Sequence, residues 1–161
     1  MKTTLSAKTW TLDDILSEII PLRRQGKKIV TTNGCFDILH SGHVHYLNDA
    51  ATFGDILIVG INSDTSVSQL KGPSRPVQKE SDRAFILAAL KMVDFVFIFS
   101  EPDPCAFLER IKPDIHVKGG DYTPEKLPET TIVEKNGGRI AIVPFLDGHS
   151  TTSLIKKIST S

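Results

Sequence analysis

The chain alternates between short apolar runs and longer helix-like stretches, and this alternation restricts its fold more than any other feature. Five runs rich in β-branched and aromatic residues are candidate strands: residues 28–32, 55–62, 94–99, 114–118 and 139–145. They are continuously apolar, which is typical of strands that are covered on both faces. Stretches with helical spacing lie between and after them: residues 43–53, 80–92, 103–111, 129–136 and about 150–158. The pattern predicts an α/β fold with a mainly parallel five-stranded sheet.

A further helix is expected before the first strand, over residues 11–24. Thr11 with Asp14 makes a capping-box-like start. The apolar side chains that we expect on one side of this helix are Leu12, Ile15, Ile19 and Ile20. The length of 161 residues suits one domain with a sizeable core. We therefore predict an N-terminal helical extension over residues 1–26 and a single Rossmann-like domain of three α/β/α layers over residues 27–161.

Composition excludes several classes of partner. Acidic and basic residues balance at 19 each, so no net field attracts the chain to nucleic acid or to an anionic membrane. No apolar run approaches the roughly 18 to 20 residues that cross a bilayer, and residues 1–8 lack the pattern of a secretion signal. The two cysteines, Cys35 and Cys105, are typical of free thiols in a reducing compartment. We expect a cytoplasmic protein.

Polar and glycine-rich residues concentrate where the candidate strands end. The four segments at those ends are residues 33–43, 62–76, 118–123 and 146–152. In open parallel sheets, ligands bind beyond the carboxyl ends of the strands. The sequence therefore predicts one ligand site assembled from these four segments.

Two histidines dominate the first segment. His40 and His43 are three residues apart, with Gly42 between them, where a strand gives way to a helix. If that helix begins near Ser41, its free N–H groups and positive dipole end face the same space as both imidazoles, which makes an anion site. Two surface histidines without a ligand are the simple alternative. A zinc site would need a third ligand, and none stands beside the pair.

The second segment carries cations. Lys71 and Arg75 lie in what we expect to be a proline-stiffened loop, where they could clamp phosphates. Arg83 begins a later helix, and it either reaches the site or pairs with Asp82 or Glu80. A solvated basic loop is the alternative for this segment.

The last two segments offer glycines, a carboxylate and hydroxyl groups. Lys118, Gly119, Gly120 and Asp121 follow the fourth strand, where paired glycines permit a ligand to approach the backbone closely. Residues 150–152, Ser-Thr-Thr, precede the last helix and could either cap it or donate to a phosphate. A plain glycine turn and a plain helix cap are the alternatives.

The motifs that are missing narrow the chemistry. The chain has neither a Walker-type phosphate loop nor a Gly-x-Gly-x-x-Gly fingerprint, which argues against a kinase, an ATPase and a dehydrogenase. It shows no nucleophile with a partnered base, and Cys35 is the one candidate thiol. Direct transfer onto an α-phosphate needs positioning and charge stabilisation more than covalent catalysis.

At these residues the chain resembles the cytidylyltransferase-like nucleotidyltransferases. The resemblance rests on His40-Ser41-Gly42-His43, preceded by Gly34-Cys35-Phe36-Asp37, and on the late Ser150-Thr151-Thr152, and it runs from about Lys28 to Ile158. Finer matches at residues 33–40, 70–77, 117–122 and 147–152 resemble the members that transfer AMP from ATP to D-glycero-β-D-manno-heptose 1-phosphate, giving ADP-heptose for lipopolysaccharide synthesis. With no kinase domain in the sequence, the chain is similar to the stand-alone form of that activity.

The resemblance implies roles for individual residues. His40, His43 and Lys71 are the implied catalytic residues, with the histidines donating to the phosphates and Lys71 holding the departing pyrophosphate. The implied nucleotide-binding residues also include Gly34, Cys35, Phe36, Lys118, Gly119, Asp121, Ser150, Thr151 and Thr152. Asp37, Arg75 and Arg83 are candidate contacts to substrate or phosphate. Mg²⁺ is implied, held mainly by the nucleotide phosphates rather than by protein ligands, and relatives suggest a homodimer.

Three alternatives stay open. The first is transfer of CMP from CTP to glycerol 3-phosphate, although Phe145 stands where that enzyme has an arginine, and Gly120 where it has an acidic residue. The second is a nucleotide-binding module without catalysis. The third is a thiol or zinc enzyme that uses Cys35 with His40. The roles of His149 and of the leading helix are open as well.

Overall fold

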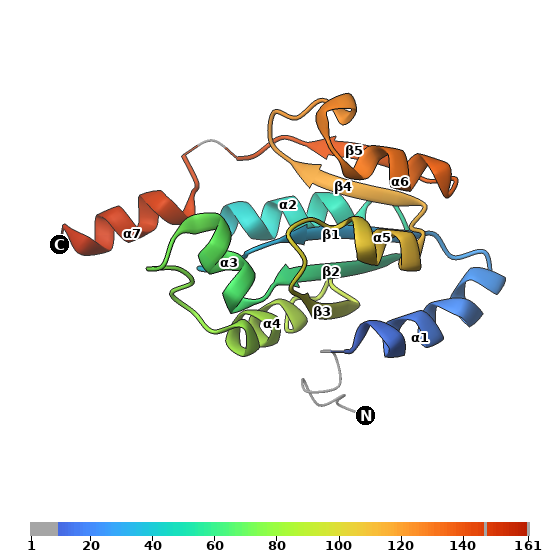
Figure 1. Ribbon diagram of the computed structural model, residues 1–161, viewed down its shortest axis with the longest axis horizontal. Helices are drawn as coiled ribbons and strands as arrows, with labels where there is room; N and C mark the ends of the chain where they lie inside the picture. Colours follow the sequence, from blue (N-terminus) through green and yellow to red (C-terminus); the bar gives the residue numbers. More distant parts are fainter. Residues whose placement is uncertain (1–9, 147, 161) are drawn as a thin grey trace.

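The sheet has five strands, all parallel, in a computed structural model that describes residues 10–146 and 148–160. The strands are β1 (Ile29–Gly34), β2 (Ile56–Asn62), β3 (Phe95–Phe99), β4 (Ile115–Gly119) and β5 (Arg139–Val143), in the order β3-β2-β1-β4-β5 (Figure 1). The predicted strands are confirmed to within one or two residues, and the mainly parallel sheet is confirmed as a wholly parallel one.

The order of the strands places the ligand crevice beside β1. Val30 on β1 pairs with Leu57 on β2 and with Ile115 on β4, so the chain runs outward from β1 in both directions. Sheets of this kind bind ligands where the strand order reverses, outside the carboxyl ends. That point lies between the ends of β1 and β4.

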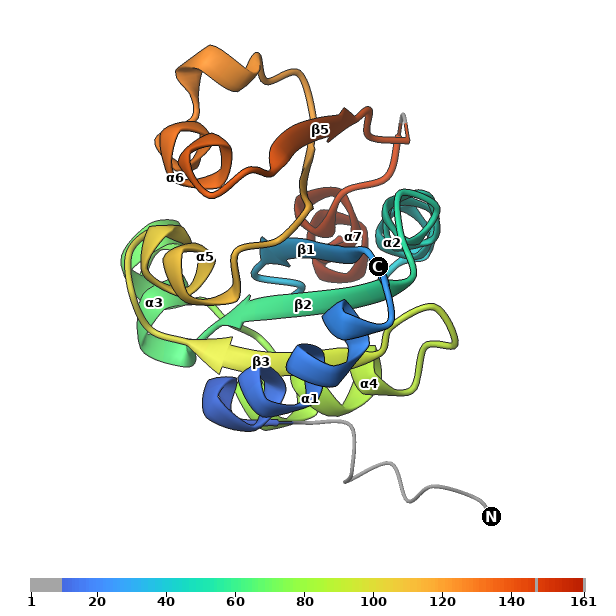
Figure 2. The ribbon, with the colours of Figure 1, turned by 90° about the vertical axis from the view of Figure 1, so that its right-hand side faces the viewer.

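Helices cover both faces of the sheet, which confirms the three-layer architecture (Figure 2). One face packs against α2 (Ser41–Ala51) and α4 (Glu80–Ala88). The other packs against α1 (Leu12–Arg24), α5 (Cys105–Ile111) and α6 (Glu129–Lys135). Both faces of the strands are therefore apolar, as their continuous patterns predict.

The leading helix packs into the second of these layers. Ile15 and Ile19 are fully buried among the side chains of β1, β2, β3 and α5, whereas Ile20 is 51% exposed. The capping box is confirmed, because Asp14 N donates to Thr11 Oγ1 and Thr11 N donates to the Asp14 carboxylate. The expectation that Ile20 shares the buried side was wrong, since the face that meets the sheet is narrower than the apolar stripe.

One expectation about the second segment was also wrong. Residues 62–76 are not a loop throughout, because α3 (Asp64–Lys71) forms there before the turn at Gly72. The Ser63 hydroxyl accepts from Ser66 N and so caps the helix, while Val67 is buried against the body. Lys71 is consequently the last residue of a helix rather than part of a flexible loop.

The remaining elements are a 3₁₀ turn, η2 (Pro124–Lys126), and the last helix, α7 (Thr151–Ser159). Figure 1 shows α7 projecting away from the body of the domain. None of its residues is buried. Among residues 10–146 and 148–160, no helix is both long enough and apolar enough to span a bilayer.

Candidate active site

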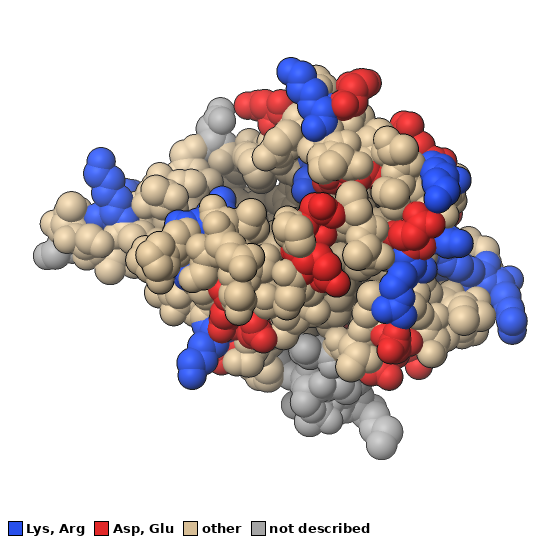
Figure 3. Space-filling model, in the orientation of Figure 1, with Lys and Arg blue, Asp and Glu red and all other residues tan. Residues whose placement is uncertain are grey.

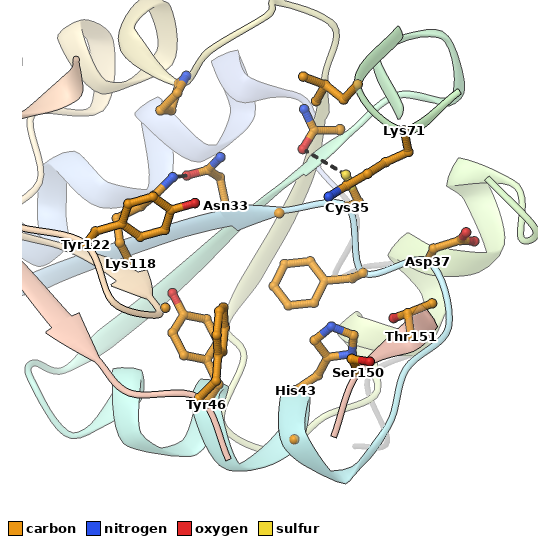
Figure 4. Close-up of a pocket in the computed structure, with 18 of the residues that line it drawn as sticks. Asn33, Cys35, Asp37, His43, Tyr46, Lys71, Lys118, Tyr122, Ser150 and Thr151 are labelled. Atoms are coloured by element: carbon orange, nitrogen blue, oxygen red, sulfur yellow. Dashed lines mark hydrogen bonds between the residues drawn. The ribbon is translucent and has the colours of Figure 1, made fainter. Parts of the chain in front are cut away.

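A cavity of about 700 Å³ opens at the carboxyl ends of β1, β2, β3 and β4. The surface is hollowed there (Figure 3), and Figure 4 shows side chains from several elements pointing into it. The structure brings together most of the residues that the sequence singled out. Those that line the cavity are Gly34, Cys35, Phe36, Asp37, His40, His43, Lys71, Arg75, Lys118, Gly119, Ser150, Thr151 and Thr152.

The two histidines stack on each other at the start of α2. The helix begins at Ser41, His40 is its N-cap, and the ring centroids of His40 and His43 are 3.8 Å apart. His43 also lies 5.2 Å, centroid to centroid, from the ring of Phe36. The Nδ1 atoms of both histidines are buried and have no hydrogen-bond partner in the described part of the chain. Each ring of the stack therefore presents one nitrogen that no described residue satisfies, at a helix N-terminus.

The surroundings keep both imidazoles neutral. Burial, together with the neighbouring His40, lowers the pKa of His43 to about 4. Burial likewise lowers the pKa of His40, with a contribution from His149. At neutral pH each ring therefore carries a single N–H and no charge.

Gly42 is required for the stack to form. A Cβ at this position would lie 2.8 Å from the Cβ of His149 and 3.0 Å from the ring of His40. The glycine in this motif therefore lets α2, the histidines and the loop before α7 approach one another closely.

Asp37 connects the loop after β1 to the turn after α3. Its carboxylate accepts from Arg75 Nε at 2.5 Å, from Val77 N at 2.8 Å and from Gln78 N at 2.9 Å. Burial alone would raise the pKa of Asp37, but these three donors outweigh it and lower the pKa below its usual value. In Figure 4 Asp37 lies at the edge of the cavity. The geometry gives it a structural role in holding this turn.

Arg83 also holds the loop after β1, from inside the protein. Its buried guanidinium donates to the carbonyls of Cys35 and Gln78 and pairs with Asp64 at 2.8 Å. Of the two alternatives for Arg83, the pairing with Asp82 or Glu80 is not the one formed, because its guanidinium pairs with Asp64, whose backbone N–H in turn donates to Glu80. Arg83 is not among the residues that line the cavity.

Cys35 faces the cavity with its sulfur 3.8 Å from Asn62 Oδ1. Burial raises the pKa of the Cys35 thiol, and this effect outweighs the nearby Lys71, Arg83 and Arg75. The thiol is therefore protonated at neutral pH and poorly suited to act as a nucleophile. Among residues 10–146 and 148–160, no three His, Cys, Asp or Glu side chains are grouped so that they could hold a metal ion.

The end of β4 forms the opposite wall. Lys118 Nζ lies 3.4 Å from Asn33 Oδ1 and 3.0 Å from Glu129 Oε1. The ring of Phe145 covers Gly119 and Gly120, where a Cβ would collide with it. Asp121 is exposed and lies outside the cavity lining, whereas its neighbour Tyr122 lines it.

The hydroxyl segment at residues 150–152 lies at the cavity as well. Ser150 Oγ accepts from Ser153 N at 3.0 Å, so this hydroxyl caps α7. Thr151 and Thr152 line the cavity with it.

Sequence reasoning missed several residues of the lining. Asn62 ends β2 and Asn33 is the last residue but one of β1, so both could have been found from their positions alone. Glu129, Phe145 and Asp103 come from segments whose place at the cavity depends on the tertiary fold.

The chain is similar to proteins of known class. The sequence model of a family described as cytidylyltransferase-like matches residues 31–160. The bifunctional protein HldE of Geotalea uraniireducens (strain Rf4) is 53% identical over 154 residues, which cover 96% of this chain and 31% of that protein. The HldE of Geobacter metallireducens is 52% identical over 152 residues, covering 94% and 31%. The chain thus spans about a third of the length of these relatives.

The chain is also similar to solved structures. A lipopolysaccharide core biosynthesis protein from Thermoplasma volcanium GSS1 superimposes with a TM-score of 0.60 at 31% identity, covering 74% of this chain and 97% of that one. A pantoate-beta-alanine ligase from Francisella tularensis reaches a TM-score of 0.60 at 18% identity, covering 95% and 78%, and shows a likeness of fold alone.

Proposed function

We propose that this chain, which belongs to the cytidylyltransferase-like family of nucleotidyltransferases, transfers AMP from ATP to D-glycero-β-D-manno-heptose 1-phosphate. The products would be ADP-heptose and pyrophosphate. The observation that carries the proposal is the cavity at the switch point of the sheet, with stacked neutral histidines at a helix N-terminus and Lys71 above them. The similarity to a lipopolysaccharide core biosynthesis protein, together with the finer matches at residues 33–40, 70–77, 117–122 and 147–152, supports a heptose acceptor.

In this reaction an oxygen of the sugar phosphate attacks the α-phosphorus of ATP. The bond from the α-phosphorus to the bridging oxygen breaks, and pyrophosphate leaves with that oxygen. His40 and His43 donate N–H groups to the phosphoryl oxygens as their charge grows. Because a nearby negative charge favours the imidazolium form, the bound triphosphate raises the pKa of both rings from their low values.

Lys71 and the α2 N-terminus complete the anion site. Figure 4 shows the Lys71 side chain reaching over the cavity from the end of α3 toward Cys35. There its ammonium can hold the pyrophosphate as it departs. The turn that follows Lys71 is held by Asp37, so the position of this cation depends on that carboxylate.

Mg²⁺ is part of the proposal, and its place would be on the nucleotide phosphates. The donors present fit this, because the Asp37 carboxylate is saturated by protein donors and Glu129 pairs with Lys118. When bound, the ion would neutralise charge on the triphosphate.

The decisive experiment is a matrix of substrates. Four nucleoside triphosphates are tested with heptose 1-phosphate, other sugar 1-phosphates and glycerol 3-phosphate, with Mg²⁺, and pyrophosphate is measured. We expect ATP with heptose 1-phosphate to give the highest kcat/KM. A preference for CTP with glycerol 3-phosphate would contradict both base and acceptor. Nucleotide binding without pyrophosphate from any pair would indicate a non-catalytic module.

A further inference from the structure

A buried polar cluster lies under the wall of the cavity formed by β4. Glu129, the first residue of α6, is only 2% exposed, and its Oε1 lies 3.0 Å from Lys118 Nζ. Lys118 Nζ also lies 3.4 Å from Asn33 Oδ1, an interaction drawn in Figure 4. Both Lys118 and Glu129 line the cavity. The ammonium is therefore held from two sides, by the end of β1 and by the start of α6.

His116 sits behind the pair and stays neutral. It is fully buried, its Nδ1 lies 2.8 Å from the Thr31 hydroxyl, and its Nε2 lies 3.9 Å from Glu129 Oε1. Burial, together with the charge of Lys118, lowers the pKa of His116 to about 3. Because His116 is uncharged, the negative charge of Glu129 is balanced by Lys118 and not by His116.

The Glu129 carboxylate relies on the Lys118 ammonium beside it. Its Oε1 is buried and accepts no hydrogen bond from the described residues, although it pairs with the Lys118 charge. Burying a carboxylate is costly, and a buried ion pair seldom adds stability over apolar residues of similar size. A group of this kind at a cavity wall points to a role in the site itself.

We propose that Glu129 is a positioning residue that holds Lys118 toward the uncharged, hydroxyl-bearing part of the nucleotide. This inference rests on the proposed function, because it requires that ATP occupies the cavity. A lysine side chain is long and flexible, so an ammonium fixed by Glu129 and Asn33 loses little freedom when the ligand arrives.

The distribution of charge between the two ends of the cavity indicates how the nucleotide is oriented. Glu129 cancels the charge of Lys118, so this end of the cavity has a donor and an acceptor but no excess of positive charge. At the other end, Lys71 lies with the neutral histidines and the α2 N-terminus. The triphosphate therefore belongs at the Lys71 end, and the Lys118–Glu129 pair faces the ribose.

The test compares two ligands by direct binding. The dissociation constants of ATP and of inorganic tripolyphosphate are measured by calorimetry for the wild type, Glu129→Gln and Glu134→Gln. Glu134 is exposed on the same helix, so Glu134→Gln is the matched control. We expect Glu129→Gln to weaken ATP binding about tenfold and to leave tripolyphosphate binding unchanged. An equal loss for both ligands, or no loss beyond that of the control, would overturn the proposal.

Further variants separate positioning from folding. Glu129→Asp keeps the charge and should recover part of the ATP affinity. Lys118→Met should weaken ATP binding at least as much as Glu129→Gln, and the double variant should lose no more than Lys118→Met alone. Additive losses would show that Glu129 does not act through Lys118. A wild type that binds ATP but releases no pyrophosphate would contradict the proposed function and leave this comparison valid, whereas a wild type without ATP affinity would contradict both.

Discussion

His40 and His43 face the cavity as neutral imidazoles, and their neutrality follows from where α2 begins. Burial disfavours a charge on either ring, and His149 adds to this effect at His40 as His40 does at His43, whose pKa is about 4. A neutral ring offers one N–H, and the strength of its hydrogen bond grows as negative charge builds on the phosphoryl oxygen. The pair is therefore suited to stabilising the transition state more than the bound substrate.

His43→Ala should lower kcat by about 10²–10³-fold, because one donor to the developing charge is lost. The melting temperature should change little, since the ring is only partly buried and its Nδ1 has no hydrogen-bond partner in the described part of the protein. His45→Ala, on the exposed side of the same helix, is the control. Steady-state kinetics with pyrophosphate detection measures the effect, and an unchanged kcat would refute the assigned role.

The stability of the protein should depend on pH through His116. With a pKa of about 3, the folded protein leaves this ring unprotonated, whereas the unfolded chain protonates it below about pH 6.5. Between these values the unfolded state binds more protons, so the free energy of unfolding falls as the pH falls, by up to about 1.4 kcal/mol per unit. Urea denaturation at pH 7, 6 and 5 should show a shallower dependence for His116→Gln than for the wild type. Parallel curves would rule out this contribution.

Predictability from sequence differs from residue to residue. The cavity positions of His40, His43 and Lys118 follow from their place at a helix start or a strand end, and that of Lys71 follows from the segment after β2. Glu129 could not be found in this way, because it reaches the cavity only through the packing of α6 against α5 and β5. Asp121 is the opposite case, a residue that the sequence places in the site but the structure does not. Its neighbours line the cavity, while its own side chain is exposed.

Among the elements, α3 and the turn after it show how local structure sets the site. Helix α3 escaped prediction because it is eight residues long and buries only Ser66 and Val67, too few for a periodic apolar pattern. The turn that follows contains two prolines and is held to the loop after β1 by Asp37. These two loops therefore form one unit that carries Lys71 to the cavity.

Asp37→Asn should loosen this unit. The amide cannot pair with Arg75 as a carboxylate does, and it leaves the partly buried backbone donors of Val77 and Gln78 poorly satisfied, which we expect to cost about 1–3 kcal/mol of stability. The KM for ATP should rise, because Lys71 and Arg75 lose their fixed positions. Urea denaturation and steady-state kinetics measure the two effects, with Asp82→Asn on the exposed side of α4 as the control. A loss of stability with an unchanged KM would separate the turn from the site.

At the scale of the whole molecule, the sequence predicts the layers but not the order of the strands. Continuous apolar runs indicate burial on both faces, and the two apolar clusters confirm it. Nothing in the runs themselves says that β1 lies between β2 and β4. That order decides which strand ends meet, and so which residues share the cavity.

The leading helix should contribute to the stability of the whole domain. Ile15 packs with no exposed surface, so Ile15→Ala should lower the free energy of unfolding by about 2–5 kcal/mol through the lost contacts and the cavity left behind. Ile20→Ala, one helix turn away and 51% exposed, should have little effect. Chemical denaturation of both variants provides the measurement. Similar small losses would mean that α1 is an appendage to the domain.

The central position of β1 also dictates an order of assembly as the chain is synthesised. Thr31 and His116, which pair across β1 and β4, are separated by 85 positions in the sequence. Until β4 has been made, a nascent chain can satisfy only one edge of β1, and the other edge presents unpaired backbone groups flanked by apolar side chains. The docking of β4 closes that edge and brings Lys118 opposite Asn33. We expect the same late event to protect the growing chain from aggregation and to create its nucleotide pocket.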